Sequence, residues 1–347
     1  MQKKRIGVIF GGCSTEYEIS LQSAYWVIKN IDKENYEVIL VGITKEGNFR
    51  RFYGDIEAIR EDTWHEDKRC VSAVISPSRE IHGLIEWRGN HTVFQWIDIA
   101  FPILHGQNGE DGTVQGLLQL AGIPFIGCGV LSSALCMDKD LAHKLVEAEG
   151  ILVPKSVLVY KEESKETIRR KVQELSYPLF VKPVHAGSSF GVTRITKEEE
   201  LEAGVDQAFL FDGEVIIEEE IKGFEVGCAI LGDKDLCIGE VDEIELSGGF
   251  FDFKEKYTLE TSKIHMPARI EKEKAEEIKR TAKKIYRILK CSGFARVDLF
   301  LTTKGEIVFN EVNTIPGFTS HSRFPNMLKG IGMEFSQIIE RLILLKL

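Results

Sequence analysis

The stretch 306-EIVFNEVNTIPGFTSHSRF-324 begins as an apolar strand and continues as a polar loop. Near the end of the strand, Glu311 and Asn313 stand two residues apart, and residues two apart in a strand share one face of a sheet. The preceding segment, 294-FARVDLFL-301, also mixes apolar residues with a few charged ones. The two segments predict a β-hairpin that carries polar side chains on one of its faces.

The register of this hairpin decides which side chains meet. If Lys304-Gly305 is the tight turn, Asp298 lies opposite Glu311 and Arg296 lies opposite Asn313. Directly opposed residues share a sheet face, so all four polar side chains fall on one side. A slip of one residue would move one strand's pair to the other face, so the prediction depends on this register.

Two carboxylates placed directly opposite each other repel, and a divalent cation would remove that cost. The oxygen atoms of Asp298, Glu311 and Asn313 are hard ligands that suit Mg²⁺, which completes its coordination with water and substrate phosphates. The alternative is a solvated hairpin face, or a network of arginine and carboxylate groups, because surface ion pairs are common and weak. At this point both interpretations stay open.

A second segment has the composition of a phosphate site. The chain contains no Walker A motif, and no G-x-G-x-x-G follows a strand. In 182-KPVHAGSSFG-191, however, small residues join two expected strands. Backbone N–H groups and hydroxyls of such residues can close around phosphate oxygens, with Lys182 as the counter-charge. Many ordinary turns are equally rich in Gly and Ser, so the segment becomes a strong indication only beside a Mg²⁺ site.

Composition excludes several classes of function. The chain has 347 residues, 43% of them hydrophobic and 28% charged, and a net charge of −10, so we expect neither nucleic acid nor an anionic membrane as a partner. No signal peptide and no membrane-spanning run is recognised, which predicts a cytoplasmic protein. The seven cysteines are scattered without a C-x-x-C pair and are interpreted as thiols of a reducing compartment.

The pattern of apolar runs predicts an α/β protein. Residues 5–41 are typical of strand, helix and strand, the opening of an open parallel sheet. Residues 50–95 contain charge runs and short strands that we cannot organise from the sequence. After residue 215, short strands punctuated by glycine indicate an antiparallel sheet. The segment 247–262 has few periodic apolar positions and is interpreted as a long functional loop.

We expect three domains. Residues 1–138 would form an N-terminal open parallel α/β domain that binds substrate, and residues 139–217 a small central α+β domain. Residues 218–347 would form a C-terminal α+β domain with an antiparallel sheet, the Mg²⁺ site and a mobile loop. Asp138 is the expected cap of the helix that opens the central domain.

At this point the residues match a family. The chain resembles the D-alanine–D-alanine ligases and their vancomycin-resistance relatives, which have the three-domain ATP-grasp fold. The resemblance covers essentially the whole length and is weakest over residues 50–95. The motifs that carry it, highly specific together and in this order, are 11-GGCSTEYEISLQS-23, 105-HGQNGEDG-112, 137-MDKD-140, 182-KPVHAGSSFGV-192, 215-VIIEEEIKGFEVGCAIL-231, 254-KEKY-257, 294-FARVD-298 and 310-NEVNTIPGFTSHS-322.

The resemblance implies the metal and nucleotide contacts. Asp298, Glu311 and Asn313 match the family's magnesium ligands, where Mn²⁺ would be a substitute. The residues that match contacts to ATP are Lys139, Lys182, Ser188, Ser189, Glu218, Glu219, Ile221, Glu225, Lys256 and Phe300. Tyr257 stands beside Lys256 in the loop that closes over the site, and Tyr257 and Ser188 are also candidate catalytic residues.

Other positions match the groups that hold the amino acids or take part in the reaction. Glu16 matches the carboxylate that helps to hold the ammonium group of the first D-alanine, and His105 matches a residue near that substrate. Arg296 and the backbone N–H of Gly317 match the pair that stabilises an oxyanion. Ser322 matches a residue that holds the carboxylate of the second substrate.

The implied reaction forms a dipeptide. Because a carboxylate is a poor acyl donor, ATP first phosphorylates D-alanine to an acyl phosphate, and the amine of a second D-amino acid then attacks. Mg²⁺ and lysines neutralise charge on the transferring phosphoryl group. Closure of 247–262 would exclude water, which otherwise hydrolyses the acyl phosphate. The resemblance also implies a homodimer through the first domain and a role in peptidoglycan synthesis.

One position departs from the common pattern and bears on the second substrate. A typical D-alanine ligase follows Ser-His-Ser with an apolar residue, whereas this chain has Arg323. A guanidinium there can hydrogen-bond a side-chain hydroxyl, and Asp242 could orient it. The chain is similar here to the D-alanine–D-serine ligases of vancomycin resistance, so we expect D-serine as the preferred second substrate and D-alanine as a weaker one. The alternative is an Arg323 that points to solvent.

Three other functions are weighed against this one. A housekeeping D-alanine–D-alanine ligase of cell-wall synthesis is the main alternative. A ligase that uses D-lactate is disfavoured, because such ligases lack the pair that stands here as Lys256-Tyr257. A nucleotide-binding regulatory protein without turnover is disfavoured, because every expected ligand, lysine and oxyanion donor is present.

Overall fold

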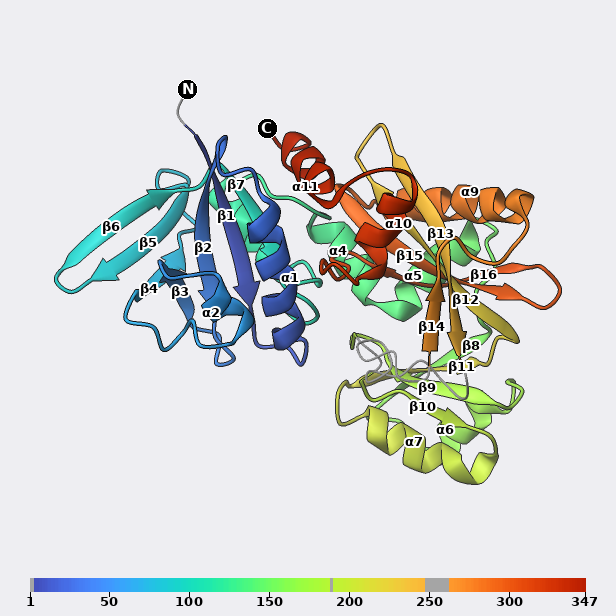
Figure 1. Ribbon diagram of the computed structural model, residues 1–347. Helices are drawn as coiled ribbons and strands as arrows, with labels where there is room; N and C mark the ends of the chain where they lie inside the picture. Colours follow the sequence, from blue (N-terminus) through green and yellow to red (C-terminus); the bar gives the residue numbers. More distant parts are fainter. Residues whose placement is uncertain (1–2, 188–189, 247–261) are drawn as a thin grey trace.

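The structure, a computed structural model, describes residues 3–187, 190–246 and 262–347. It contains three β-sheets, each covered by helices (Figure 1). The strands are β1 (Lys4–Gly11), β2 (Tyr36–Ile43), β3 (Phe49–Phe52), β4 (Cys70–Ile75), β5 (Gly83–Arg88), β6 (His91–Trp96), β7 (Ile99–Ile103), β8 (Ser156–Tyr160), β9 (Leu179–Pro183), β10 (Thr193–Ile195), β11 (Glu214–Glu219), β12 (Gly223–Leu231), β13 (Cys237–Leu246), β14 (Ser262–His265), β15 (Phe294–Thr302) and β16 (Ile307–Asn313).

The described helices alternate with these strands along the chain. They are α1 (Tyr17–Asn30), α2 (Glu57–Arg60), α3 (Thr113–Ala121), α4 (Val130–Met137), α5 (Lys139–Ala148), α6 (Lys165–Val172), α7 (Leu201–Ala208), α9 (Lys272–Ile288), α10 (Arg323–Gly330) and α11 (Phe335–Leu344), with a 3-10 turn at Glu198–Glu200. Among the described residues, no helix is both long and apolar enough to cross a membrane.

The first sheet has seven strands in the order β6-β5-β4-β3-β2-β1-β7. Its β2-β1-β7 part is parallel, as the sequence predicted. The prediction of a parallel sheet is wrong for the rest, because β3 to β6 extend it with antiparallel pairs. This extension is the part of the chain that the sequence did not organise, and its β5–β6 hairpin projects away from the molecule (Figure 1).

The second sheet is small and antiparallel, in the order β10-β9-β11-β8, with α6 and α7 packed against it (Figure 1). Strand β11 continues to Glu219, so the predicted domain boundary between residues 217 and 218 falls inside a strand. The hydrogen bonds of β11 to both neighbours keep the whole strand in this sheet, and a boundary would have to follow it.

The third sheet is antiparallel throughout, in the order β14-β13-β12-β15-β16. Its core includes side chains of α4 and α5, among them Cys136, Ala142 and Val146. The prediction that α5 opens the central domain is therefore wrong about packing, because the apolar side of α5 is buried against the third sheet. The predicted cap is confirmed, since the side chain of Asp138 accepts a hydrogen bond from the Leu141 N–H at 2.9 Å.

The C-terminal helices join the third sheet to the first. Residues of β1, α1, α10 and α11 share one buried apolar cluster, which includes Leu21, Phe318, Phe324 and Ile339. Helix α11 lies near α1 at the edge of the first sheet (Figure 1). This shared core fixes the loop between β16 and α10 against the first sheet, and that loop carries the predicted Gly317 and Ser322.

The β15–β16 hairpin has the predicted register where it matters for the site. Arg296 pairs with Asn313 and Asp298 pairs with Glu311. The predicted turn is wrong, because the loop has three residues, 303–305, closed by the hydrogen bond from the Thr302 N–H to the Glu306 carbonyl.

A β-bulge reconciles the two findings. On the turn side of Asp298 the register shifts by one residue, so that Leu299 pairs with Phe309 and Asn310 is the extra residue. A bulge of this kind changes which face a strand presents beyond it. The extra residue in the turn and the extra residue in the bulge shift the register in opposite directions. The four polar side chains therefore lie on one face of the hairpin.

Candidate active site

The centre of the site is a row of residues that runs across four strands of the third sheet. In register order from β13 to β16 the row is Asp242, Gly227, Asp298 and Glu311. Arg323, the first residue of α10, lies over the glycine of this row. A Cβ atom at Gly227 would lie 2.3 Å from Arg323 Nη2, so only a glycine leaves room for the guanidinium between the two aspartates.

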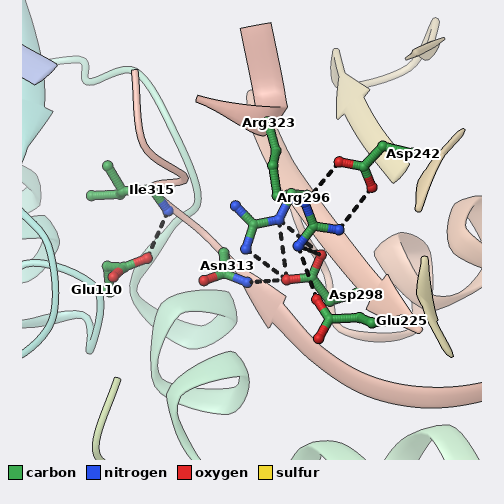
Figure 2. A network of polar contacts seen from close by, with 8 residues as sticks. All are labelled: Glu110, Glu225, Asp242, Arg296, Asp298, Asn313, Ile315 and Arg323. Carbon is green, nitrogen blue, oxygen red and sulfur yellow. Dashed lines mark hydrogen bonds and ion pairs between the residues drawn. The ribbon is translucent and has the colours of Figure 1, made fainter. Parts of the chain in front are cut away.

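Arg323 makes ion pairs with carboxylates on both sides of Gly227. Its Nε and Nη2 donate to the two carboxylate oxygens of Asp242 at 2.7 and 2.8 Å (Figure 2). Its Nη1 donates to Glu225 at 2.9 Å and lies 3.3 Å from Asp298 Oδ1. The side chain is 8% exposed, so the alternative of a solvent-facing arginine is wrong, and the expected pairing with Asp242 is present.

Asp298 accepts hydrogen bonds from its own face of the hairpin as well. Arg296 donates from Nε at 2.8 Å and from Nη2 at 2.6 Å, and the Asn313 Nδ2 donates at 2.8 Å (Figure 2). Burial lowers the pKa of Arg296, but the carboxylate of Asp298 offsets this effect, so that the pKa is raised overall. We call Arg296, Asp298, Asn313 and Arg323 the hairpin network.

The donor set of this face fits a hard divalent cation. Asp298 and Glu311 bring opposed carboxylates, and Asn313 retains its amide oxygen, which suits Mg²⁺ with water and phosphate as further ligands. Among the residues that the structure describes, no group of three or more His, Cys, Asp or Glu side chains is arranged to hold a metal ion. A two-carboxylate, one-amide site is of a different composition and does not conflict with that finding.

Next to the hairpin network lies a cavity of about 450 Å³ between the second and third sheets. Its lining includes every described residue that was predicted to contact the nucleotide, together with the predicted metal ligand Glu311. These residues are Lys139, Lys182, Glu218, Glu219, Ile221, Glu225 and Phe300. The size of the cavity, its mixed polar and apolar lining and the two lysines fit a nucleoside triphosphate.

Within this cavity Lys182 and Glu218 form a buried ion pair of 2.5 Å. Burial raises the pKa of Glu218, but Lys182 and His143 more than offset this and keep it below the ordinary value. Lys139 Nζ donates to the carbonyl of Ala186 at 2.6 Å, which ties helix α5 to the Gly/Ser-rich loop after β9. The two lysines thus stand at the start of the predicted phosphate loop.

His185 holds the same loop from outside. Its Nδ1 lies 2.9 Å from Asp212 and its Nε2 lies 3.4 Å from Asp138, the cap of α5. The hydrogen bonds to Asp138 and Asp212 raise the pKa of His185 to about 10, so it is a cation at neutral pH. This histidine belongs to the motif 182-KPVHAGSSFGV-192, and no role was predicted for it.

Glu16, the predicted ligand of the first substrate's ammonium group, lies between loops that follow strands of the first and second sheets. A Cβ atom at Gly106 would be 2.7 Å from Glu16 Oε2, and one at Gly187 would be 2.8 Å from it. The carboxylate therefore lies between the loop after β7 and the predicted phosphate loop. His105, next to Gly106, is buried, and its Nδ1 lies 2.8 Å from the carbonyl oxygen of Ile315.

The loop between β16 and α10 brings together Gly317, the predicted oxyanion donor, and Ser322, the predicted ligand of the second substrate's carboxylate. A Cβ atom at Gly317 would lie 2.9 Å from Ser322 Oγ. Ser322 occupies the N-cap position of α10, yet its hydroxyl accepts from the Thr319 N–H at 2.9 Å instead of capping the helix. Four other predicted residues, Ser188, Ser189, Lys256 and Tyr257, lie outside the described residues, as does the predicted loop apart from Ser262.

Sequence reasoning missed several residues of this site. Gly227 had a signal, since a glycine inside a strand often marks a close approach. Ser23 also had one, because it recurs three residues after Ser20 on the buried side of α1. Glu110 lies five residues after His105 in a quoted motif, but nothing in the sequence says that both of its oxygens accept backbone N–H groups.

Comparison with known proteins gives a consistent result. Residues 5–128 match the family described as "D-ala D-ala ligase N-terminus", and residues 145–344 match the one described as "D-ala D-ala ligase C-terminus". A D-alanine--D-alanine ligase of Caldicellulosiruptor bescii is 46% identical over 348 residues, 99% of this chain and 95% of that protein. The vancomycin B-type resistance protein VanB of Enterococcus faecalis is 43% identical over 350 residues, 99% of each chain.

A solved structure is similar over the full length of both chains. The crystal structure of VanG D-Ala:D-Ser ligase from Enterococcus faecalis has a TM-score of 0.93 and 55% sequence identity, and the match covers 100% of each chain. Both family matches, the full-length relatives and the three-sheet architecture agree. The chain belongs to the D-alanine–D-alanine ligase family.

Proposed function

We propose that this chain is an ATP-dependent ligase that joins D-alanine to D-serine through a D-alanyl phosphate. The observation that carries the proposal is the buried Arg323, held by Asp242 beside the predicted carboxylate site of the second substrate. The 55% identity with an enzyme named as a D-Ala:D-Ser ligase supports the same choice of substrate. The product would be a precursor of a modified peptidoglycan that resists vancomycin.

In the first step, the carboxylate of D-alanine takes the terminal phosphoryl group of ATP, which forms the acyl–phosphate C–O–P bond and releases ADP. Glu16 would hold the ammonium group of D-alanine, and Lys139 and Lys182 would hold the ATP phosphates at the mouth of the cavity. Asp298, Glu311 and Asn313 would hold Mg²⁺ there, and a bound Mg²⁺ neutralises charge on the phosphoryl group.

In the second step, the amine of the acceptor forms a C–N bond to the acyl carbon. The carbonyl oxygen becomes an oxyanion, for which Arg296 and the Gly317 N–H are the proposed donors. The C–O bond to phosphate then breaks, inorganic phosphate leaves with the electron pair, and the amine gives up a proton to solvent. Ser322 would hold the carboxylate of the acceptor in this step.

The preference for D-serine follows from the number of donors on Arg323. A guanidinium has five N–H groups, and the contacts to Asp242, Glu225 and Asp298 use at most four of them. Among the residues that the structure describes, at least one N–H of Arg323 is left to bind a side-chain hydroxyl. A site that hydrogen-bonds a substrate hydroxyl discriminates against an analogue without it, because its own polar group is then left unpaired.

Product analysis with mixed D-alanine and D-serine tests the proposal. We expect D-alanyl-D-serine as the main dipeptide, with a fall of about 10-fold or more in the D-Ser/D-Ala ratio of kcat/KM for Arg323→Leu. An Arg323→Leu enzyme with the wild-type ratio would remove the assignment of Arg323.

The second candidate is a D-alanine–D-alanine ligase of cell-wall synthesis. It is favoured by the 46% identity with a relative of that name. ADP release with D-alanine alone, equal to that with added D-serine, would favour this candidate. Absence of ADP release in both cases would favour a nucleotide-binding protein without turnover.

A further inference from the structure

The loop that carries Gly317 is held by hydrogen bonds from the first sheet's helix and loop. The Phe318 N–H donates to Ser23 Oγ at 3.2 Å, and Ser23 Oγ lies 3.1 Å from His105 Nε2. His105 Nδ1 in turn lies 2.8 Å from the Ile315 carbonyl oxygen. The chain of contacts therefore starts and ends on the same loop, at residues that flank Gly317.

Chemistry fixes the direction of every hydrogen bond in this chain. A carbonyl oxygen can only accept, so His105 Nδ1 carries the proton that it donates to Ile315. Burial lowers the pKa of His105, so the ring is neutral and its Nε2 accepts. Ser23 must then donate its hydroxyl proton to His105 Nε2, and its oxygen is left to accept from the Phe318 N–H. Each of the two side chains thus donates one hydrogen bond and accepts one.

A third contact holds the N–H group of the same residue, Ile315. The Ile315 N–H donates to Glu110 Oε1 at 2.8 Å (Figure 2). Glu110 Oε2 accepts from the Gly106 N–H at 2.9 Å. We call Ser23, His105 and Glu110 the seam. Between its anchor points at Ile315 and Phe318 lie only Pro316, whose ring fixes φ, and Gly317.

The proposal concerns the acyl-transfer step. We infer that Ser23 is a positioning residue, which acts with His105 to hold the 315–318 segment so that the Gly317 N–H faces the oxyanion. This inference rests on the proposed function, because it takes Gly317 as an oxyanion donor. The physical reason is the steep dependence of such a donor on its position, since a misplacement of about 1 Å can cost about 100-fold in rate.

Ser23→Ala removes the link and leaves the Phe318 N–H and His105 Nε2 without their partner. The two chemical steps separate positioning from a general loss of structure, because Gly317 is required only for the second. In a single turnover with ATP, D-alanine and D-serine, we expect ADP to form at the wild-type rate. Dipeptide formation should be slower by about 10-fold to 100-fold.

Ser20→Ala is the matched control. Ser20 lies one turn earlier on α1, is equally buried, accepts from the Gly11 N–H at 2.8 Å and donates to the Ile103 carbonyl. Among the described residues, its side chain makes no hydrogen bond to the 315–318 segment. We expect the ADP and dipeptide rates of this variant to stay in their wild-type ratio, although its thermal stability falls by about as much as that of Ser23→Ala.

Ser23→Cys keeps the side-chain volume and weakens the hydrogen bonds, so it replaces Ser23→Ala if that variant does not fold. We expect its rate of dipeptide formation to lie between those of the wild type and Ser23→Ala. A wild-type dipeptide rate in a folded Ser23 variant overturns the inference, and so does an equal slowing of both steps. Failure of the proposed function is a different result, because the wild-type protein itself would then form no ADP from D-alanine.

Discussion

The hairpin network and the seam hold the same loop region by opposite means. The hairpin network joins charged side chains of neighbouring strands and the first residue of α10, and its central acceptor is the buried Asp298. The seam joins residues of the first 110 positions to backbone groups of Ile315 and Phe318. Charge is thus concentrated at the proposed sites of the oxyanion and the cation, and neutral hydrogen bonds hold the backbone of residues 315–318.

This difference has an energetic reason. Removing the partner of a buried charge is strongly destabilising, whereas a neutral hydrogen bond contributes about 1 kcal/mol net to the free energy of unfolding. The hairpin network is therefore the more costly to disturb, and its members are fixed to one another by the register of the sheet. The seam is weaker, and it exists only when the first sheet packs against the C-terminal helices.

The largest expected effect comes from Asp298→Asn, which tests the hairpin network. Arg296 and Arg323 would lose their shared carboxylate, and breaking a buried pair costs about 3–5 kcal/mol. We also expect kcat to fall by about 1000-fold, since the proposed metal site and the proposed oxyanion donor Arg296 are both disturbed. Urea unfolding and ADP release measure the two effects.

Glu202→Gln is the matched control for this variant. Glu202 also faces two cations, Lys165 and Arg169, but the cluster is exposed. Its loss should have little effect on the free energy of unfolding and leave kcat unchanged. If Asp298→Asn were as mild as this control, the distinction between a charged centre and an ordinary surface pair would be lost.

The second-largest expected effect is a pH dependence of the protein's stability, which arises from Glu110 in the seam. Burial, and then the nearby Glu16, raise the pKa of Glu110 from 4.5 to about 8. The folded protein keeps a proton on Glu110 that the unfolded chain has lost between these values. Its contribution to the free energy of unfolding is therefore present below pH 4.5 and falls as pH rises to about 8, by at most about 1.4 kcal/mol per pH unit.

Urea unfolding at pH 6 and pH 8 compares the wild type with Glu110→Gln, which does not titrate. The wild type should lose more stability over this interval than the variant. Identical losses would mean that Glu110 is already ionised at pH 6, and the seam would then be a charged network like the hairpin.

The smallest effect is expected from Gly227→Ala, which acts on the hairpin network through packing alone. The added methyl group would lie 2.3 Å from Arg323 Nη2 and 2.8 Å from Asp242 Oδ1, so the guanidinium has to move. We expect the D-Ser/D-Ala ratio of kcat/KM to fall about fivefold, a difference of about 1 kcal/mol. Gly116→Ala, which meets no atom within 4 Å, is the control and should keep the ratio.

Particular residues show how far the sequence could be interpreted. The pairing of Asp298 with Glu311 is confirmed, although the turn from which it was deduced is wrong and a bulge at Asn310 makes up the difference. The nucleotide residues came from a resemblance, and the described ones line one cavity. The antiparallel strands at residues 49–96 and the packing of α5 on the third sheet were not predicted, because short strands and a short apolar helix face carry no information about their partner.

The sequence by itself determined which side chains of a strand share a face. Successive side chains point to opposite faces of the sheet, and this alternation is a property of the local backbone. The sequence therefore predicted the carboxylate pair of Asp298 and Glu311, while the resemblance to the family singled out Lys139, Lys182 and Arg323. Only the tertiary structure decided that Arg323 lies over Gly227, and that Ser23, His105 and Glu110 reach a loop more than 200 residues further along the chain. Such contacts are made by the packing of one apolar core against another, and no local pattern encodes which backbone groups that packing brings within reach.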